Sequence, residues 1–214
     1  RIPVLPISWG DALPILEQLR GTPAPNDDWK GALPITYHIG PGPVTVRMRT
    51  AYDWQVRPIY NVIARIEGST FPDEWIIHGN HHDGWCAGAT DPISGAVQLM
   101  ETARGFGELL QAGVRPRRTV IFALWDAEEW GLLGSTEWAE THRDELRAKG
   151  GTYSTSDSTG KGWLSLAGSH TLQRFLNEVA RDIEDPERGM SVFAAARARR
   201  LETAANPDAR HAVE

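Results

Sequence analysis

The feature that constrains the fold most is an apolar run that ends in a cluster of acids. Residues 118–125, RTVIFALW, are almost all apolar or β-branched. Such a run is typical of a strand buried on both faces of a parallel sheet. The next four residues, DAEE at 126–129, carry three carboxylates. Crowded carboxylates repel one another and lose hydration on burial, so we expect a bound cation to offset that cost.

The order of the expected elements predicts an α/β fold. Strands are expected at 59–68, 74–83, 118–125 and 152–157, and helices at 94–113, 134–151 and 168–183, the last capped by Ser169. Strands that alternate with helices indicate a mainly parallel sheet with helices on both faces. We also expect one short helix at about 10–20 in the Pro- and Gly-rich N-terminal stretch, and a helix followed by a tail in the last thirty residues.

Composition excludes several classes of protein. The chain has 214 residues, 41% hydrophobic and 23% charged, which is an ordinary globular balance and argues against disorder. No apolar run approaches the roughly 20 residues that span a bilayer. The net charge of −6 and the lack of a Lys/Arg stripe argue against a nucleic-acid partner. The single cysteine, Cys86, rules out an internal disulfide and a cysteine-rich zinc site.

Polar clusters fall where the predicted strands end. They are HHDG at 81–84, TDP at 90–92, DAEE at 126–129 and SDS at 156–158. Ligands of open α/β sheets bind at the carboxyl ends of the strands. Each cluster contains a histidine or a carboxylate, and these are the ligands that Zn²⁺ takes when cysteine is absent. The sequence therefore predicts a zinc centre at this edge of the sheet.

Three motifs resemble one family of peptidases. NHHDGWCAGATDPISGA, RPRRTVIFALWDAEEWGLLGSTEWAE and YSTSDS are similar to the glutamate carboxypeptidase branch of the co-catalytic zinc exopeptidases. That branch also contains prostate-specific membrane antigen and the non-enzymatic transferrin receptors. IPVLPISWGDA and GALPITYHIGPG resemble the end of the protease-associated (apical) domain of that branch. We therefore expect the C-terminal part of that domain at 1–55 and the N-terminal half of the zinc peptidase domain at 56–214.

The resemblance implies a role for each matching residue. His81 and Asp157 would bind one zinc ion, Asp91 would bridge two, and Glu129 would bind the second. Glu128 would be the general base, which takes a proton from the attacking water and passes it to the leaving amine. The implied activity is that of a carboxypeptidase-like exopeptidase with two Zn²⁺ that acts on small peptides.

Neighbouring residues are assigned supporting roles. Asp83 would orient the imidazole of His81, and the Asp91–Pro92 bond would be cis. His82 adjoins His81, but successive strand residues face opposite ways, so the family pattern selects His81. Asp126 is either a ligand or an acid that caps the following turn, and we favour the cap.

Other residues have an ordinary structural interpretation. Glu137 and Glu140 match a pair that binds Ca²⁺ in the family, but the other calcium ligands would come from apical residues absent here, so we expect a solvated helix face. Trp85, Trp125 and Trp130 flank the motifs, and packing in the core or in a pocket wall explains them.

The resemblance also implies a missing ligand. The family's second zinc takes one more histidine, and the downstream candidates, His170 and His211, lie in segments that do not match. We therefore expect this chain to be a piece of a longer peptidase, inert alone, whose parent is a homodimer in an unassigned compartment (secreted, periplasmic or membrane-anchored). Two alternatives remain: a non-catalytic binding module like the transferrin receptors, and an aminopeptidase of the same family.

Overall fold

The computed structural model describes residues 4–206, which form two compact units divided between Arg57 and Pro58. The first unit contains helix α1 (Trp9–Leu16), the antiparallel pair β1 (Thr22–Pro23) and β2 (His38–Ile39), and a 3-10 helix (Asp27–Trp29). Helix α1 begins after Ser8, whose hydroxyl accepts a hydrogen bond from the Asp11 amide, and it ends four residues before the expected boundary. The identity of this unit as part of a protease-associated domain stays a prediction.

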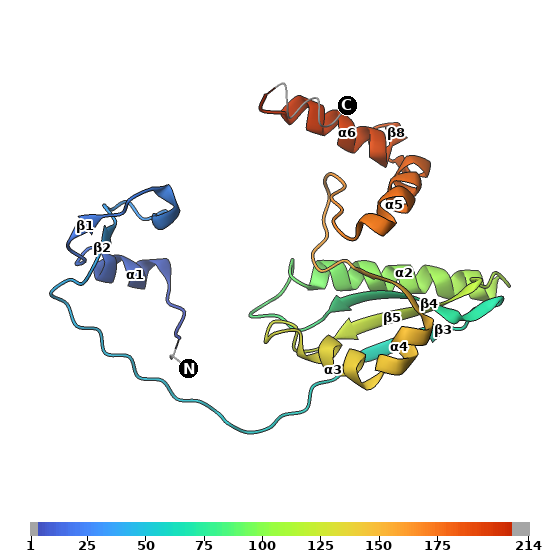
Figure 1. The fold of residues 1–214 in the computed structure, drawn as a ribbon, viewed down its shortest axis with the longest axis horizontal. Coiled ribbons are helices and arrows are strands. Elements are labelled where there is room, and N and C mark those ends of the chain that lie inside the picture. The colour runs from blue at the N-terminus through green and yellow to red at the C-terminus, as the bar shows by residue number, and fades with distance from the viewer. Residues whose placement is uncertain (1–3, 207–214) are drawn as a thin grey trace. The chain divides into compact units, whose positions relative to one another are not determined.

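The second unit is built on a four-stranded sheet (Figure 1). Its strands are β3 (Val62–Ile66), β4 (Phe71–His81), β5 (Arg118–Trp125) and β6 (Gly150–Thr155). The order is β3-β5-β4-β6, with β4 parallel to both β5 and β6 and β3 antiparallel to β5. The prediction of a mainly parallel sheet is therefore confirmed.

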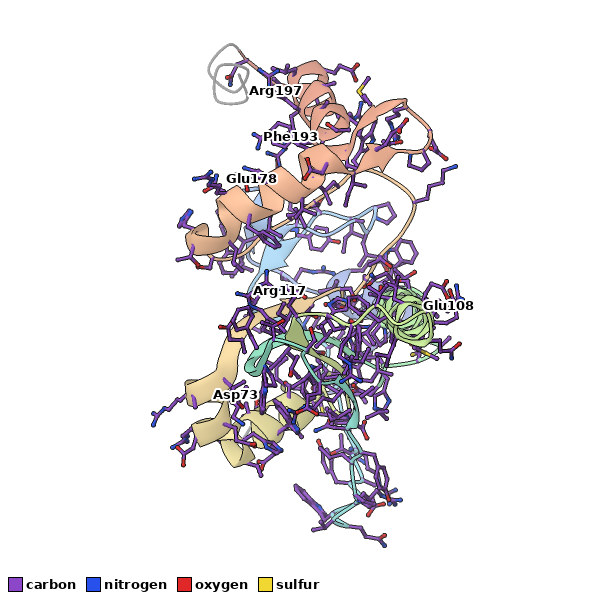
Figure 2. All side chains as sticks on the ribbon, turned by 90° about the vertical axis from the view of Figure 1, so that its right-hand side faces the viewer. Asp73, Glu108, Arg117, Glu178, Phe193 and Arg197 are labelled. Atoms are coloured by element: carbon purple, nitrogen blue, oxygen red, sulfur yellow. The ribbon has the colours of Figure 1, made fainter. Side chains whose placement is uncertain are left out.

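Helices cover both faces of the sheet, as predicted. They are α2 (Ile93–Gln111), α3 (Leu133–Thr141) and α4 (Arg143–Lys149). On one face Leu99 of α2 packs with Phe122, and on the other Trp138 of α3 and Leu146 of α4 pack against Ile121. Successive residues of a strand point to opposite faces, so β5 contributes to both cores. Figure 2, which looks along α2, shows side chains filling the space between that helix and the sheet.

The single helix predicted at 134–151 is wrong, because the structure breaks it at His142. This residue has φ −99° and ψ 21°, and it separates α3 from α4. Trp138 before the break and Leu146 after it pack against the same buried cluster. On a continuous helix of 3.6 residues per turn these two side chains would lie about 80° apart and would also share one face, so their common core does not explain the break.

The rest of the second unit follows β6. It comprises α5 (His170–Asp182), the antiparallel pair β7 (Glu184–Asp185) and β8 (Met190–Ser191), and α6 (Val192–Thr203). The Ser169 hydroxyl accepts a hydrogen bond from the Thr171 amide, which confirms the predicted cap. His211 lies outside the described residues. Within residues 4–206 no helix combines the length and the apolar character that a membrane crossing requires.

Candidate metal centre

Three parallel strands end at one edge of the sheet, and the predicted ligands lie there. His81 is the last residue of β4 and pairs with Trp125, the last residue of β5. Asp157 follows the end of β6 by two residues. Asp91 lies just before α2, and its bond to Pro92 is cis, as the resemblance implied. The fold thus brings together residues separated by up to 76 positions in the chain.

The ligand atoms of His81, Asp91 and Asp157 form a compact group. The His81 Nε2 atom lies 3.1 Å from an Asp91 carboxylate oxygen and 3.3 Å from an Asp157 carboxylate oxygen. Two ligand atoms about 2.1 Å from a tetrahedral zinc ion are about 3.4 Å apart. Within residues 4–206, no other three or more His, Cys, Asp or Glu side chains place ligand atoms within 4.8 Å of one another. Spacing and donor types therefore both fit zinc.

Asp83 joins this group to the acidic loop. One of its oxygens lies 3.4 Å from the His81 Nδ1 atom, which leaves Nε2 directed at the two aspartates. Its carboxylate also accepts hydrogen bonds from the backbone amides of Glu128, at 3.0 Å, and Glu129, at 3.3 Å. Burial raises the pKa of the Asp83 carboxyl, but these hydrogen bonds outweigh it and hold the pKa below its usual value. One carboxylate thus contacts both His81 and the loop that carries Glu128.

The structure places the two adjacent glutamates differently. A carboxylate oxygen of Glu128 lies 3.9 Å from the His81 Nδ1 atom, and the side chain is partly buried. The Glu129 backbone is held by Asp83, but its carboxylate does not belong to the compact ligand group. His81, Asp91 and Asp157 are therefore brought together, whereas a role of Glu129 as a zinc ligand stays a prediction.

Burial and charge shift the proton affinities of the site. Burial raises the pKa of the Glu128 carboxyl, and the charges of Glu129, Asp157 and Asp83 add to the rise against the opposing effect of His81. Burial lowers the pKa of His81, but its hydrogen bonds to Asp157 and Asp83 and the Glu128 charge outweigh that effect, so the pKa is raised. A carboxyl whose pKa rises toward the operating pH is better suited to general base catalysis.

The residues beside the ligands have structural roles. Asp126 accepts hydrogen bonds from the amides of Ala127 and Tyr60, both at 2.8 Å, which confirms the cap. The His82 Nε2 atom lies 3.0 Å from the Tyr60 carbonyl oxygen and takes no part in the ligand group, as predicted.

Sequence reasoning missed the part played by Asn80. Its buried side chain donates hydrogen bonds to the carbonyls of His81, at 3.1 Å, and Pro92, at 3.0 Å. It thereby ties the two segments that carry His81 and Asp91. Its position next to His81 was the only signal in the sequence.

The three tryptophans that flank the motifs separate into two groups. Trp125 is 5% exposed, and its indole N–H donates to the Tyr153 hydroxyl at 3.1 Å. Trp85 and Trp130 are exposed and form a tilted pair with ring centroids 5.3 Å apart. The expected core packing is therefore confirmed for Trp125 alone.

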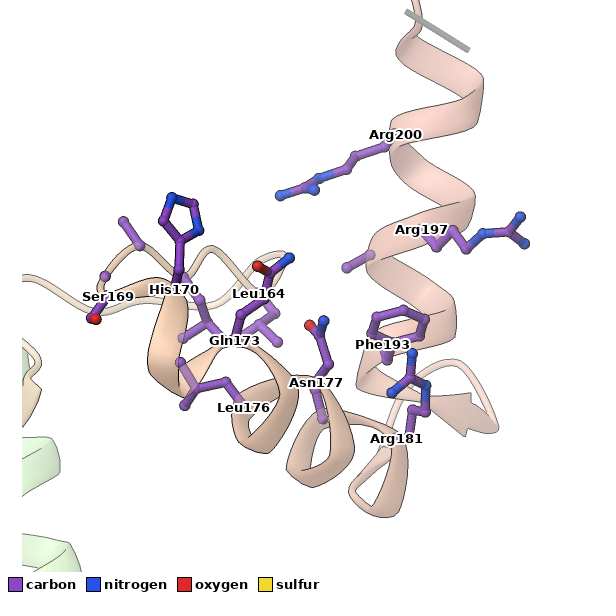
Figure 3. A pocket seen from close by; sticks show the side chains of 15 residues that line it. Leu164, Ser169, His170, Gln173, Leu176, Asn177, Arg181, Phe193, Arg197 and Arg200 are labelled. Atoms are coloured by element: carbon purple, nitrogen blue, oxygen red, sulfur yellow. The ribbon is translucent and has the colours of Figure 1, made fainter. Parts of the chain in front are cut away.

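The remaining candidate ligands lie away from this group. Glu137 and Glu140 are exposed on α3, and among the described residues neither belongs to a compact group of ligand atoms. His170 is exposed, as predicted, at the start of α5. It lines a cavity of about 590 Å³ between α5 and α6 (Figure 3). None of His81, Asp91, Asp157, Glu128 and Glu129 lines that cavity, so it is not part of the metal centre.

Comparison with known families identifies the chain. Residues 61–193 match the model of peptidase family M28. The chain belongs to peptidase family M28. The match begins just before β3, spans the whole sheet and ends within α6, so it includes every residue of the compact ligand group.

Several curated proteins are similar to most of the chain. A maize protein named probable glutamate carboxypeptidase VP8 is 38% identical over 87% of this chain, and rat aminopeptidase NAALADL1 is 38% identical over 90%. A Caenorhabditis briggsae glutamate carboxypeptidase 2 homolog is 37% identical over 87%. The chain spans only about a quarter of the length of these relatives, between 25% and 27%.

A solved structure is also similar to part of the chain. It is the Peptidase M28 precursor from Shewanella amazonensis SB2B, which is 31% identical. The similarity covers 56% of this chain and 27% of the other, with a TM-score of 0.47.

Proposed function

We propose that these residues belong to a two-zinc metallo-exopeptidase that releases terminal residues from small peptides in the manner of a carboxypeptidase. The observation that carries the proposal is the compact group of His81, Asp91 and Asp157 with the Glu128 carboxylate beside it. Membership of family M28 supports the reaction class. We further propose that the first unit is the end of a protease-associated domain, on the resemblance of IPVLPISWGDA and GALPITYHIGPG to that domain.

The donors present fit one zinc ion and part of a second site. His81 and Asp157 would hold the first ion, Asp91 would bridge, and Glu129 would hold the second. Bound zinc would lower the pKa of an attacking water and polarise the scissile carbonyl. Asp83 keeps the Nδ1 side of His81 engaged, so that Nε2 remains available to the metal.

Glu128 is the proton carrier in this proposal. Its carboxylate takes a proton from the attacking water and delivers it to the nitrogen of the leaving amine. The raised pKa helps the carboxyl to hold that proton between the two steps. The backbone hydrogen bond to Asp83 fixes the residue next to His81.

The names of the relatives favour an exopeptidase, but they disagree on whether it removes the amino-terminal or the carboxyl-terminal residue. Two of the similar proteins are named glutamate carboxypeptidases, one of them as probable, and one is named an aminopeptidase. We propose that the carboxyl-terminal residue is released. Paired peptides blocked at either the amino or the carboxyl end distinguish the two, because a carboxypeptidase cleaves the amino-blocked peptide only.

The substitution Glu128→Gln tests the proposal. The full-length protein should keep its zinc and lose turnover by at least about a hundredfold, because the amide cannot accept the proton. Zinc content by elemental analysis and hydrolysis of a panel of small peptides measure the two effects. Glu67→Gln, an exposed change just after β3 at the opposite end of the sheet, serves as the matched control and should leave both unchanged. Turnover at the wild-type rate in Glu128→Gln would contradict the assignment.

A further inference from the structure

The loop at 126–134, which carries Glu128 and Glu129, has an unusual backbone. Ala127 and Leu132 adopt left-handed conformations with φ of 54° and 61°, and Gly131 has φ 113°. A left-handed conformation is unfavourable at a residue other than glycine and persists only when surrounding contacts enforce it. The loop therefore needs restraints from outside its own sequence.

One side chain spans the two ends of this loop. The side-chain Oδ1 atom of Asn61 accepts a hydrogen bond from the Asp126 backbone amide at 3.0 Å. The side-chain Nδ2 atom of Asn61 donates a hydrogen bond to the Gly134 backbone carbonyl at 2.8 Å. The Gly134 amide also donates to the Asp126 carbonyl at 3.0 Å. Asn61 thus bridges the same two residues that close the loop through the backbone, from a position 65 residues earlier in the chain.

The fit around Asn61 is tight. A Cβ atom added to Gly134 would lie 2.4 Å from the Asn61 side-chain oxygen and 2.3 Å from the Asp126 carbonyl oxygen. Such distances are far below van der Waals contact. Because residue 134 is glycine, there is room for the Asn61 side chain between Asp126 and Gly134. Asn61 is partly buried there.

We propose that Asn61 is a positioning residue, which clamps the loop at 126–134 and thereby holds Glu128 and Glu129 in place. An amide side chain suits this task because it offers one acceptor to the Asp126 amide and one donor to the Gly134 carbonyl. The consequence for catalysis rests on the proposed function of Glu128. The clamp itself does not depend on that function.

Hydrogen exchange in the metal-free chain tests the clamp directly. Asn61→Ala should speed exchange of the loop amides at 131–134 at least tenfold, because these amides donate to carbonyls within the loop. Exchange in β4 and β6 should change less than twofold. Asn61→Asp keeps the side-chain volume and the acceptor but loses the donor to Gly134, so it should also speed exchange of the loop amides. This second variant decides the test if Asn61→Ala fails to fold.

Thr119→Val is the matched control. Thr119 is wholly buried at the start of β5, and its hydroxyl accepts from the Gly68 amide and donates to the Pro72 carbonyl, so this change also removes two hydrogen bonds. The control should leave exchange at 131–134 at the wild-type rate. Unchanged loop exchange in both Asn61 variants, or the same increase in Thr119→Val, would overturn the proposal.

Steady-state kinetics of the full-length protein test the consequence. Asn61→Ala should lower kcat at least tenfold and leave KM within threefold, because a displaced Glu128 impairs proton transfer without removing a substrate contact. A kcat within twofold of wild type would overturn the link between the clamp and Glu128. A wild-type protein without peptidase activity would contradict the proposed function instead, and the exchange measurement would still decide the role of Asn61.

Discussion

At the scale of single residues, His81 is held from both sides of its ring. Asp83 faces Nδ1, and the carboxylates of Asp91 and Asp157 face Nε2. Burial lowers the pKa of His81, but without a metal ion the carboxylates of Asp157, Glu128 and Asp83 favour the protonated imidazole and raise the pKa above its ordinary value of 6.5. The same arrangement would suit His81 to bind zinc and would make that binding sensitive to pH.

This arrangement predicts how zinc affinity depends on pH. A proton on His81 must leave before zinc binds. Because the pKa of His81 is raised above 6.5, the affinity for zinc should start to decrease before the pH has been lowered to 6.5. Below the raised pKa the fall should reach about tenfold per pH unit for this one proton. Competition with a chromophoric chelator between pH 8 and pH 5 measures it. An affinity that stays constant down to pH 6.5 would contradict the raised pKa.

At the scale of elements, helix α2 packs directly against the segment that carries Asp157. Gly95 lies in the first turn of α2, and a Cβ atom there would lie 2.0 Å from the Asp157 carbonyl oxygen and 3.0 Å from that of Ser156. The close approach lets the start of α2 meet the end of β6. The absence of a side chain at 95 is therefore part of what places Asp157 in the compact group.

The substitution Gly95→Ala should accordingly weaken zinc binding at least about tenfold, the size of effect seen when groups that support metal ligands are altered. The added methyl group must push the Asp157 backbone away. Gly107→Ala in the same helix is the matched control, because nothing lies within 4 Å of a Cβ there. The control should bind zinc normally and gain about 0.5–1 kcal/mol of stability. Chelator competition and thermal unfolding measure both variants, and normal zinc affinity in Gly95→Ala would rule out this role.

The elements also show what could be predicted from sequence and what could not. The strand at 118–125 was predicted with the observed bounds, because a continuous run of apolar residues can be recognised directly in the sequence. The break at His142 was missed, because the sequence on both sides of it predicts one continuous helix. For the site, the motifs identified His81, Asp91 and Asp157. The bonds of Asp83 and Asn61 to backbone atoms were not predictable, since a backbone partner leaves no signature in the sequence.

At the level of the complete chain, the residues that the structure describes form two compact units, and the segment at their boundary has no regular secondary structure. Residues 44–61 form no helix or strand, and the boundary between the units falls within them. All three predicted ligands of the compact group, together with Glu128 and Asp83, lie in the second unit. The second unit should therefore keep the metal centre without the first.

Limited digestion with trypsin tests this division. Cleavage should begin after Arg47 or Arg49, which are exposed and outside any helix or strand. The large fragment should retain zinc, because every ligand of the compact group lies beyond the cut. Mass spectrometry of the first products identifies the sites. Initial cleavage within α2 or the four-stranded sheet would contradict the division.

If His81, Asp91 and Asp157 together hold zinc, the zinc content of the chain must depend on each of them. After dialysis, elemental analysis should find at least one zinc ion per wild-type chain and almost none in Asp91→Ala. Asp73→Ala, which removes an exposed carboxylate at the far end of β4, should match the wild type. A wild-type chain without zinc, or an Asp91→Ala chain that keeps it, would show that these three residues do not hold the ion.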